Sequence, residues 1–162
     1  MFILSKIVLL NIAISFFLFF NINLDAESYV YPLLSEKVSS NFGTRKHPIK
    51  KIRKHHNGID LAVPADTPVR AIRSGKIVFS DVHKGYGNLI TIMHNLKDFS
   101  LYGHLKSFNV EIGQEVKSGQ IIGFVGSSGL ATGPHLHLEI IKDGKAINPK
   151  KVLKNLGNSA EG

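Results

Sequence analysis

The chain has 162 residues, a formal net charge of +8 at pH 7 and no cysteine. Without thiols it forms no disulfide and no thiolate-ligated metal site, so its stability rests on an apolar core and any metal needs histidine or carboxylate ligands. The length suits one domain. The positive charge favours anionic partners, namely cell-wall polymers, lipid headgroups or nucleic acid.

The first 26 residues have the pattern of a secretory signal peptide. Lys6 precedes an apolar stretch over residues 7–20, and the sequence then turns polar. This stretch is shorter than the roughly 20 residues of a spanning helix, but extending it leaves an uncleaved inner-membrane anchor over residues 7–24 as an alternative. Export to the periplasm or cell wall favours wall polymers or a membrane surface as partners and argues against nucleic acid.

After residue 26, short apolar runs are broken by glycine, asparagine and aspartate, and no helical period is sustained. This pattern predicts strands joined by tight turns. We expect one all-β domain over residues 27–157, an antiparallel sheet built as a sandwich or half-barrel with its site in a groove. The predicted strands span residues 59–62, 68–72, 75–82, 88–94, 100–105, 120–125 and 135–141.

The C-terminal part carries recognisable turn chemistry. Asp143 and Gly144 predict a hairpin turn after the last long strand. Asn148 followed by Pro149 is typical of the N-cap and first position of a helix, which predicts one short C-terminal helix. Residues 158–162 are small and polar, and we expect them to form a flexible tail.

The densest basic segment lies between residues 45 and 56. Two interpretations stay open, a contact surface for an acidic substrate and a solvated loop, because charges on a mobile surface are screened within about 8 Å at physiological salt. The basic residues of this segment are Arg45, Lys46, Lys50, Lys51, Arg53 and Lys54.

Three histidine-bearing clusters point to metal chemistry. In the run Gly133 to His137, His135 and His137 lie two apart on a predicted strand, so their side chains share a face. Two imidazoles alone make a poor zinc site, because a catalytic zinc usually takes three protein ligands and a water. Further ligands must therefore come from elsewhere in the chain.

The second cluster runs from His56 to Asp60. On an ideal strand these two side chains would lie about 13 Å apart, too far to share an ion. We expect a turn at Asn57 and Gly58 to bring them together, because both residue types tolerate left-handed conformations. A helix would also join them, but Gly58 and the strand-like residues that follow argue against one.

The third cluster is Leu101 to Leu105, which places His104 on a predicted strand near Tyr102. A lone histidine in this setting is usually structural. Together, however, the three clusters supply four imidazoles and one carboxylate, which is more than structure alone requires.

These motifs resemble those of the lysostaphin-type zinc endopeptidases, also called LytM-like peptidoglycan hydrolases. That family's pattern is HxxxD, then a tyrosine-containing strand with HL, then GPHLH followed by an acidic residue. Here the pattern is met by His56 with Asp60, by Tyr102 with His104 and Leu105, and by residues 133–139.

Flanking segments extend the resemblance to about residues 38–149 and imply the family's duplicated hybrid type of sheet. They include residues 41–45 with His47 and Pro48, residues 75–78 with 85–88, and the glycines at 113, 119 and 123. Three positions depart from the family: Asp66 replaces a glycine, Ala131 a serine and Leu138 a phenylalanine. None removes a ligand, and Asp66 is tolerable in a left-handed turn.

The resemblance implies one zinc ion per chain, held by His56, Asp60 and His137. His104 and His135 would then be catalytic, one accepting a proton from a zinc-activated water and the other stabilising the oxyanion, in an order that the sequence does not assign. Glu139 is either a support for the site or structural.

The resemblance also suggests three substrate-binding residues. Asn41 and Arg45 would line the groove or anchor a loop, and Tyr102 would contact substrate or belong to the core or the groove wall. Four further histidines have no partner at useful spacing and are interpreted as surface or structural; they are His47, His55, His83 and His94.

The resulting hypothesis is an exported, monomeric zinc metalloendopeptidase that hydrolyses peptide bonds in peptidoglycan stem peptides or cross-bridges. Two alternatives belong to other classes. One is a non-catalytic protein that binds the wall or activates an amidase, although all five site positions are present. The other is a non-haem iron oxygenase, because two histidines and a carboxylate also suit iron, although the extra histidines disfavour it.

Overall fold

A computed structural model describes residues 28–46, 53–154 and 156. The predicted signal peptide, the predicted tail and His47 lie outside these residues. Among the residues described, no helix has the length and apolar character needed to cross a membrane.

The described chain is almost entirely strand. The strands are β1 (Lys37–Ser40), β2 (Gly43–Lys46), β3 (Arg53–His56), β4 (Gly58–Ala62), β5 (Pro68–Arg70), β6 (Gly75–His83), β7 (Gly87–Met93), β8 (Phe99–Phe108), β9 (Glu115–Val116), β10 (Ile121–Val125), β11 (His135–Lys142) and β12 (Lys145–Ile147). Two 3-10 helices complete the described elements, η1 (Lys84–Tyr86) and η2 (Pro149–Lys151).

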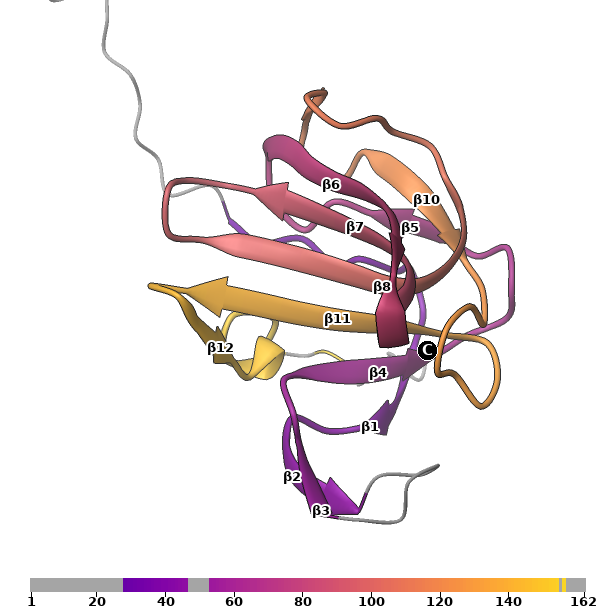
Figure 1. Ribbon diagram of the computed structural model, residues 1–162. Coiled ribbons are helices and arrows are strands. Elements are labelled where there is room, and N and C mark those ends of the chain that lie inside the picture. The colour runs from indigo at the N-terminus through magenta and orange to yellow at the C-terminus, as the bar shows by residue number, and fades with distance from the viewer. Residues whose placement is uncertain (1–27, 47–52, 155, 157–162) are drawn as a thin grey trace, which may run out of the picture.

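Within the described residues, ten strands form one open sheet whose pairings are all antiparallel. Its main path is β1-β4-β11-β8-β7-β6-β9, while β10 bridges β8 and β5, and β12 pairs with β11. Figure 1 shows β4, β11, β8 and β7 side by side, with β5 and β10 behind them. The expected antiparallel all-β fold is confirmed.

Strands β2 and β3 form a separate two-stranded hairpin that projects beyond the main sheet (Figure 1). It contains both described parts of the basic segment, with Arg45 opposite Lys54. The segment that could have been a solvated loop is therefore strand at both ends, while residues 47–52 are outside the described part of the chain.

Alternation along two neighbouring strands separates the core from the opposite face. Leu136, Leu138 and Ile140 of β11 point into the core, as do Ile59 and Leu61 of β4. Because successive side chains of a strand face opposite ways, the residues between them point to the other side of the sheet. The residues that alternate with the core residues are His135, His137 and Glu139 on β11 and Asp60 on β4.

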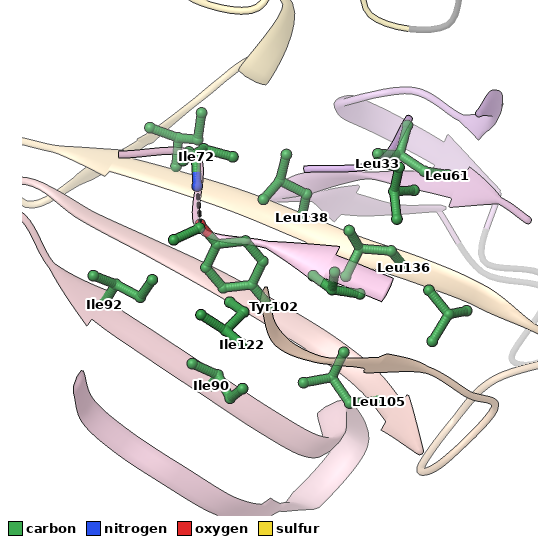
Figure 2. Packing of buried hydrophobic residues seen from close by; sticks show 14 of the residues in the cluster. Leu33, Leu61, Ile72, Ile90, Ile92, Tyr102, Leu105, Ile122, Leu136 and Leu138 are labelled. Carbon is green, nitrogen blue, oxygen red and sulfur yellow. Dashed lines mark hydrogen bonds between the residues drawn. The ribbon is translucent and has the colours of Figure 1, made fainter. Parts of the chain in front are cut away.

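Tyr102, from β8, lies among the core residues of Figure 2. It is 0% exposed, and its hydroxyl accepts a hydrogen bond from the Ile72 backbone N–H at 2.9 Å. The hydroxyl also lies 2.9 Å from Ser100 Oγ. The hydroxyl, which is the one polar atom of this buried side chain, therefore has hydrogen-bond partners.

The predicted C-terminal turns are present. Asp143 and Gly144 both have positive φ, 49° and 73°, and form the two-residue turn between β11 and β12. Asn148 caps η2 by accepting a hydrogen bond from Lys150 N at 3.0 Å, and Pro149 begins the helix. The expected short helix is confirmed, as a single 3-10 turn.

Candidate metal centre

Three strands bring one carboxylate and two imidazoles to a single point. His56 ends β3, Asp60 lies on β4, and His137 lies directly opposite Asp60 on β11. His137 Nδ1 is 2.8 Å from Asp60 Oδ1, and His56 Nε2 is 3.2 Å from the same oxygen. The two ring nitrogens are 3.1 Å apart. The structure therefore brings together the three residues that the resemblance implies as metal ligands.

The turn expected between His56 and Asp60 is present, but its physical basis differs from the prediction. Neither Asn57 nor Gly58 has positive φ, so no left-handed residue makes the turn. Gly58 is required by space instead. A Cβ at this position would lie 2.3 Å from the Leu138 carbonyl oxygen, so the absence of a side chain lets β4 approach β11 closely.

The second nitrogen of each ligand histidine is held by an acceptor. His56 donates from Nδ1–H to the Asn41 carbonyl at 3.0 Å. His137 donates from Nε2–H to Glu139 Oε1 at 2.9 Å. Because the outward nitrogen of each ring holds a proton in these hydrogen bonds, the inward nitrogens that face Asp60 are the ones whose lone pairs a metal ion would take, an arrangement typical of metal-binding histidines.

The donor set fits a zinc ion. Ligands at about 2.0–2.1 Å around a tetrahedral zinc are about 3.3 Å from one another, close to the 2.8–3.2 Å found among these three atoms. The charges fit as well. Burial raises the pKa of Asp60, but hydrogen bonds with His137 and His56 outweigh burial and hold this pKa well below its usual range. The carboxylate is therefore ionised.

The pocket also stabilises positive charge. Burial lowers the pKa of His137, but hydrogen bonds to Asp60 and Glu139 outweigh it and raise this pKa to about 9. A cation placed between the same groups meets the same attraction.

His104 and His135 lie beside this cluster, with ring centroids 4.6 Å apart. Each donates from Nδ1–H to a backbone carbonyl at 2.8 Å, His104 to Ser128 and His135 to Gly133. In both rings Nε2 is therefore the nitrogen left for chemistry at the site. Burial lowers the pKa of His104 to about 4, so its ring is neutral at neutral pH and able to accept a proton. Its φ of 61° lies in the left-handed region, which is unusual for a residue other than glycine.

The substrate-binding assignment of Tyr102 is wrong. The side chain is fully buried and its hydroxyl is engaged by Ile72 and Ser100, so no surface remains for a ligand. The core alternative holds for this residue. Asn41 is exposed, and its backbone carbonyl holds His56, which makes it an anchor of the centre. For Arg45 the structure describes the backbone in β2 only, so its role stays a prediction.

Sequence reasoning missed Tyr86. Its ring lies 5.5 Å from the ring of His137, and its hydroxyl donates to Glu139 Oε1 at 2.8 Å. Burial, and then the charge of Glu139, raises the pKa of this phenol, so it stays protonated. The one signal in the sequence was its place between Gly85 and Gly87.

Three other histidines lie away from the cluster. His55 is exposed and packs edge-on against Phe42 at 5.0 Å, so His56 is the member of this pair that points inward. His83 is exposed and contacts the rings of Phe79 and Tyr86. His94 bonds to the Ser74 carbonyl and to Ser100 Oγ. Their surface or structural interpretation agrees with these contacts.

An open antiparallel sheet that carries a His-Asp-His cluster and two adjoining imidazoles is the arrangement of a lysostaphin-type metallopeptidase. Comparison with known families matches residues 54–149 to "Peptidase family M23", which is more than half of the chain. The chain belongs to this family.

Similar curated proteins include a DD-carboxypeptidase/endopeptidase and a peptidoglycan DD-endopeptidase. The DD-carboxypeptidase/endopeptidase Mpg of Neisseria gonorrhoeae is 46% identical over 123 residues, which are 76% of this chain and 28% of that protein. The peptidoglycan DD-endopeptidase ShyA of Vibrio cholerae is 42% identical over 123 residues, 75% of this chain and 29% of ShyA. This chain thus spans less than a third of the length of either relative.

Solved structures give the same result. A zinc-containing peptidase from Vibrio cholerae superimposes with a TM-score of 0.69 at 35% identity, covering 75% of this chain and 39% of that one. The catalytic domain of lysostaphin from Staphylococcus simulans superimposes with a TM-score of 0.68 at 37% identity, covering 74% of this chain and 92% of that domain. The fold is therefore that of a lysostaphin catalytic domain.

Proposed function

We propose that this protein is a zinc metalloendopeptidase that hydrolyses peptide bonds in the stem peptides or cross-bridges of peptidoglycan. The observation that carries the proposal is the convergence of His56 Nε2, Asp60 Oδ1 and His137 Nδ1 on one point. The substrate class is supported by relatives named as peptidoglycan DD-endopeptidases.

His56, Asp60 and His137 would hold the ion through these atoms. When bound at a site with an open position, zinc acts as a Lewis acid and lowers the pKa of water there to about 7. Two neutral imidazoles and one carboxylate leave the site with net positive charge, which favours an anionic transition state.

The two remaining histidines divide the proton chemistry. We assign proton acceptance from the attacking water to His104, whose neutral ring presents a lone pair on Nε2. His135 presents its Nε2 3.8 Å from Asp60 Oδ1, where a protonated ring can donate to the oxyanion formed at the substrate carbonyl. The carbonyls of Ser128 and Gly133 keep both rings in these orientations.

The test combines metal analysis of the purified protein with mass spectrometry of the muropeptides released from sacculi of defined cross-link chemistry. We expect one zinc per chain and products shortened or separated at peptide bonds, while glycan bonds stay intact. Zinc-free protein that leaves sacculi intact would sink the enzyme hypothesis and favour a non-catalytic wall-binding protein. Iron in place of zinc, with no released peptides, would favour the oxygenase alternative.

We further propose that residues 1–26 direct export, because a peptidoglycan substrate lies outside the cytoplasm. The apolar stretch after Lys6 supports this proposal. Fractionation of cells that produce the full chain, compared with a variant that lacks residues 2–26, tests it. We expect only the full chain outside the cytoplasm, and equal distribution of the two would refute an export role.

A further inference from the structure

A hydrogen-bonded chain runs from Tyr86 to the ligand nitrogen of the centre. The Tyr86 hydroxyl donates to Glu139 Oε1 at 2.8 Å, and the same oxygen accepts from His137 Nε2–H at 2.9 Å. Glu139 is 4% exposed. Burying a carboxylate is unfavourable unless hydrogen bonds replace those it made with water. Tyr86 and His137 both donate to the same oxygen, Oε1, and together they fix its direction.

The fold leaves space for Tyr86 at this place. Gly103 of β8 pairs with His137 of β11, and a Cβ at Gly103 would lie 3.3 Å from Tyr86 Cδ1 and 3.5 Å from His137 Cβ. The missing side chain lets the tyrosine ring cross β8 and cover the imidazole, with ring centroids 5.5 Å apart. The position of the Tyr86 ring therefore depends on the absence of a side chain at Gly103.

The backbone that carries Tyr86 is fixed against the loop that holds His104. Gly85 O accepts from Leu130 N at 2.9 Å, and Asn88 N donates to Ser128 Oγ at 2.9 Å. Gly87 has φ of 64°, and a Cβ there would meet Ser128 at 2.4 Å. The turn at η1 and the loop around Ser128 are thus hydrogen-bonded to each other. The first carries Tyr86, whose ring contacts His137, and the second supplies the carbonyl that accepts from His104.

We propose that Tyr86 and Glu139 are positioning residues that keep the proton of His137 on Nε2, so that Nδ1 is the nitrogen offered to the metal. This inference rests on the proposed metal site. A histidine can bind metal through either nitrogen, and here Asp60 and His56 lie on the Nδ1 side only. Glu139 selects the tautomer and Tyr86 orients Glu139, so Tyr86 acts on the metal through Glu139.

The test measures zinc affinity of the full chain by competition with a chelator in four variants: Glu139→Ala, Glu139→Gln, Tyr86→Phe and the double variant Tyr86→Phe/Glu139→Ala. Loss of a group that supports a metal-binding histidine typically weakens affinity about 10–100-fold. We expect that loss for Glu139→Ala, a smaller loss for Glu139→Gln, which keeps a carbonyl acceptor, and a loss of less than about tenfold for Tyr86→Phe.

The double variant gives the sharpest result. Because Tyr86 acts through Glu139, we expect the double variant to bind zinc as Glu139→Ala does, with no added loss. Losses of zinc affinity that add up in the double variant would overturn the inference that Tyr86 acts through Glu139. Equal affinity, within about twofold, of the wild type and all four variants would overturn the positioning role.

A matched control and a direct readout separate positioning from general damage. Tyr29→Phe removes a buried hydroxyl that has no hydrogen-bond partner in the described structure, and we expect unchanged zinc affinity. In NMR spectra, the Nε2–H of His137 should exchange slowly with solvent in the wild type and faster in Glu139→Ala. Equally fast exchange in both would contradict the proposal whatever the folding state of the variant.

The outcomes also distinguish this inference from the proposed function. Affinity losses in the expected order, in a protein that leaves sacculi intact, would uphold the positioning role and refute the hydrolase. If the protein is a zinc-dependent hydrolase but its zinc affinity is unchanged by substitution of Glu139 and Tyr86, the proposed function is upheld and the positioning role is refuted. A wild-type chain that binds no zinc would overturn both.

Discussion

At the scale of single residues, the four histidines of the centre differ in the group that holds their outward nitrogen. Three of them donate from Nδ1–H to backbone carbonyls, of Asn41, Ser128 and Gly133, while His137 alone donates from Nε2–H to a carboxylate. Backbone carbonyls belong to the strands and turns, so the fold itself sets three tautomers. The fourth depends on the side chain of Glu139.

Two substitutions separate ligand from proton carrier. We expect His56→Ala to lose zinc and activity together, because the site would keep only two ligands. His104→Ala should keep zinc within a few-fold and lose about 10²–10⁴ in kcat, the usual contribution of a general base. Metal content by mass spectrometry and release of muropeptides measure both quantities. Loss of zinc from His104→Ala would show that the ligand assignment is wrong.

Tyr102→Phe tests whether this ring is core or substrate contact. Removing the hydroxyl leaves the buried Ile72 N–H without its partner, which costs about 1–3 kcal/mol in the free energy of unfolding. Well below the melting temperature we expect kcat/KM to be unchanged. Urea unfolding and muropeptide kinetics measure the two effects, with Tyr29→Phe as the control for loss of a hydroxyl. A raised KM with an unchanged free energy of unfolding would instead indicate that Tyr102 contacts substrate.

At the scale of elements, sequence patterns predicted what is local and apolar. The alternation of His135, Leu136, His137 and Leu138 predicted a strand with the core on one face and the histidines on the other, which β11 confirms. Strands β1, β2, β3 and β9 were not predicted, because they are two to four residues long and mostly polar. Their pairing depends on neighbours in the fold, and side-chain alternation does not reveal it.

The contact of Tyr86 with Glu139 was not predictable for a related reason. The two residues are 53 positions apart, and their meeting depends on the space above Gly103. The convergence of His56 with Asp60 was predictable, since a shared ion requires a turn between them. The detail of that turn was not, because the glycine is required by the Leu138 carbonyl across the sheet.

Gly58→Ala tests this close approach. The added Cβ would lie 2.3 Å from Leu138 O, so β4 and β11 must separate and carry Asp60 away from His137. We expect a loss of more than about 2 kcal/mol in the free energy of unfolding, typical of overpacking, together with weaker zinc binding. Gly133→Ala is the matched control, because nothing lies within 4 Å of its Cβ and its φ is not positive. Equal melting temperatures for the two variants would contradict the steric argument.

At the scale of the whole molecule, the metal centre joins two sheets that share no strand pairing among the described residues. The main sheet is open, and the β2–β3 hairpin has no strand pairing to it among the described residues. His56 ends that hairpin, whereas Asp60 and His137 belong to the central strands of the sheet. An ion bound by all three ties the hairpin to the sheet.

Metal binding should therefore stabilise the fold measurably. A ligand that binds only the folded state at 100 times its Kd adds about 2.7 kcal/mol, which for a domain of this size raises the melting temperature by several degrees. Thermal unfolding with zinc, compared with unfolding after dialysis against a chelator, measures this shift. We expect His104→Ala to show the wild-type shift and His56→Ala to show almost none, because only His56 links the hairpin to the ion. A full shift in His56→Ala would mean that the ion is held without the hairpin, and that β4 and β11 alone form the site.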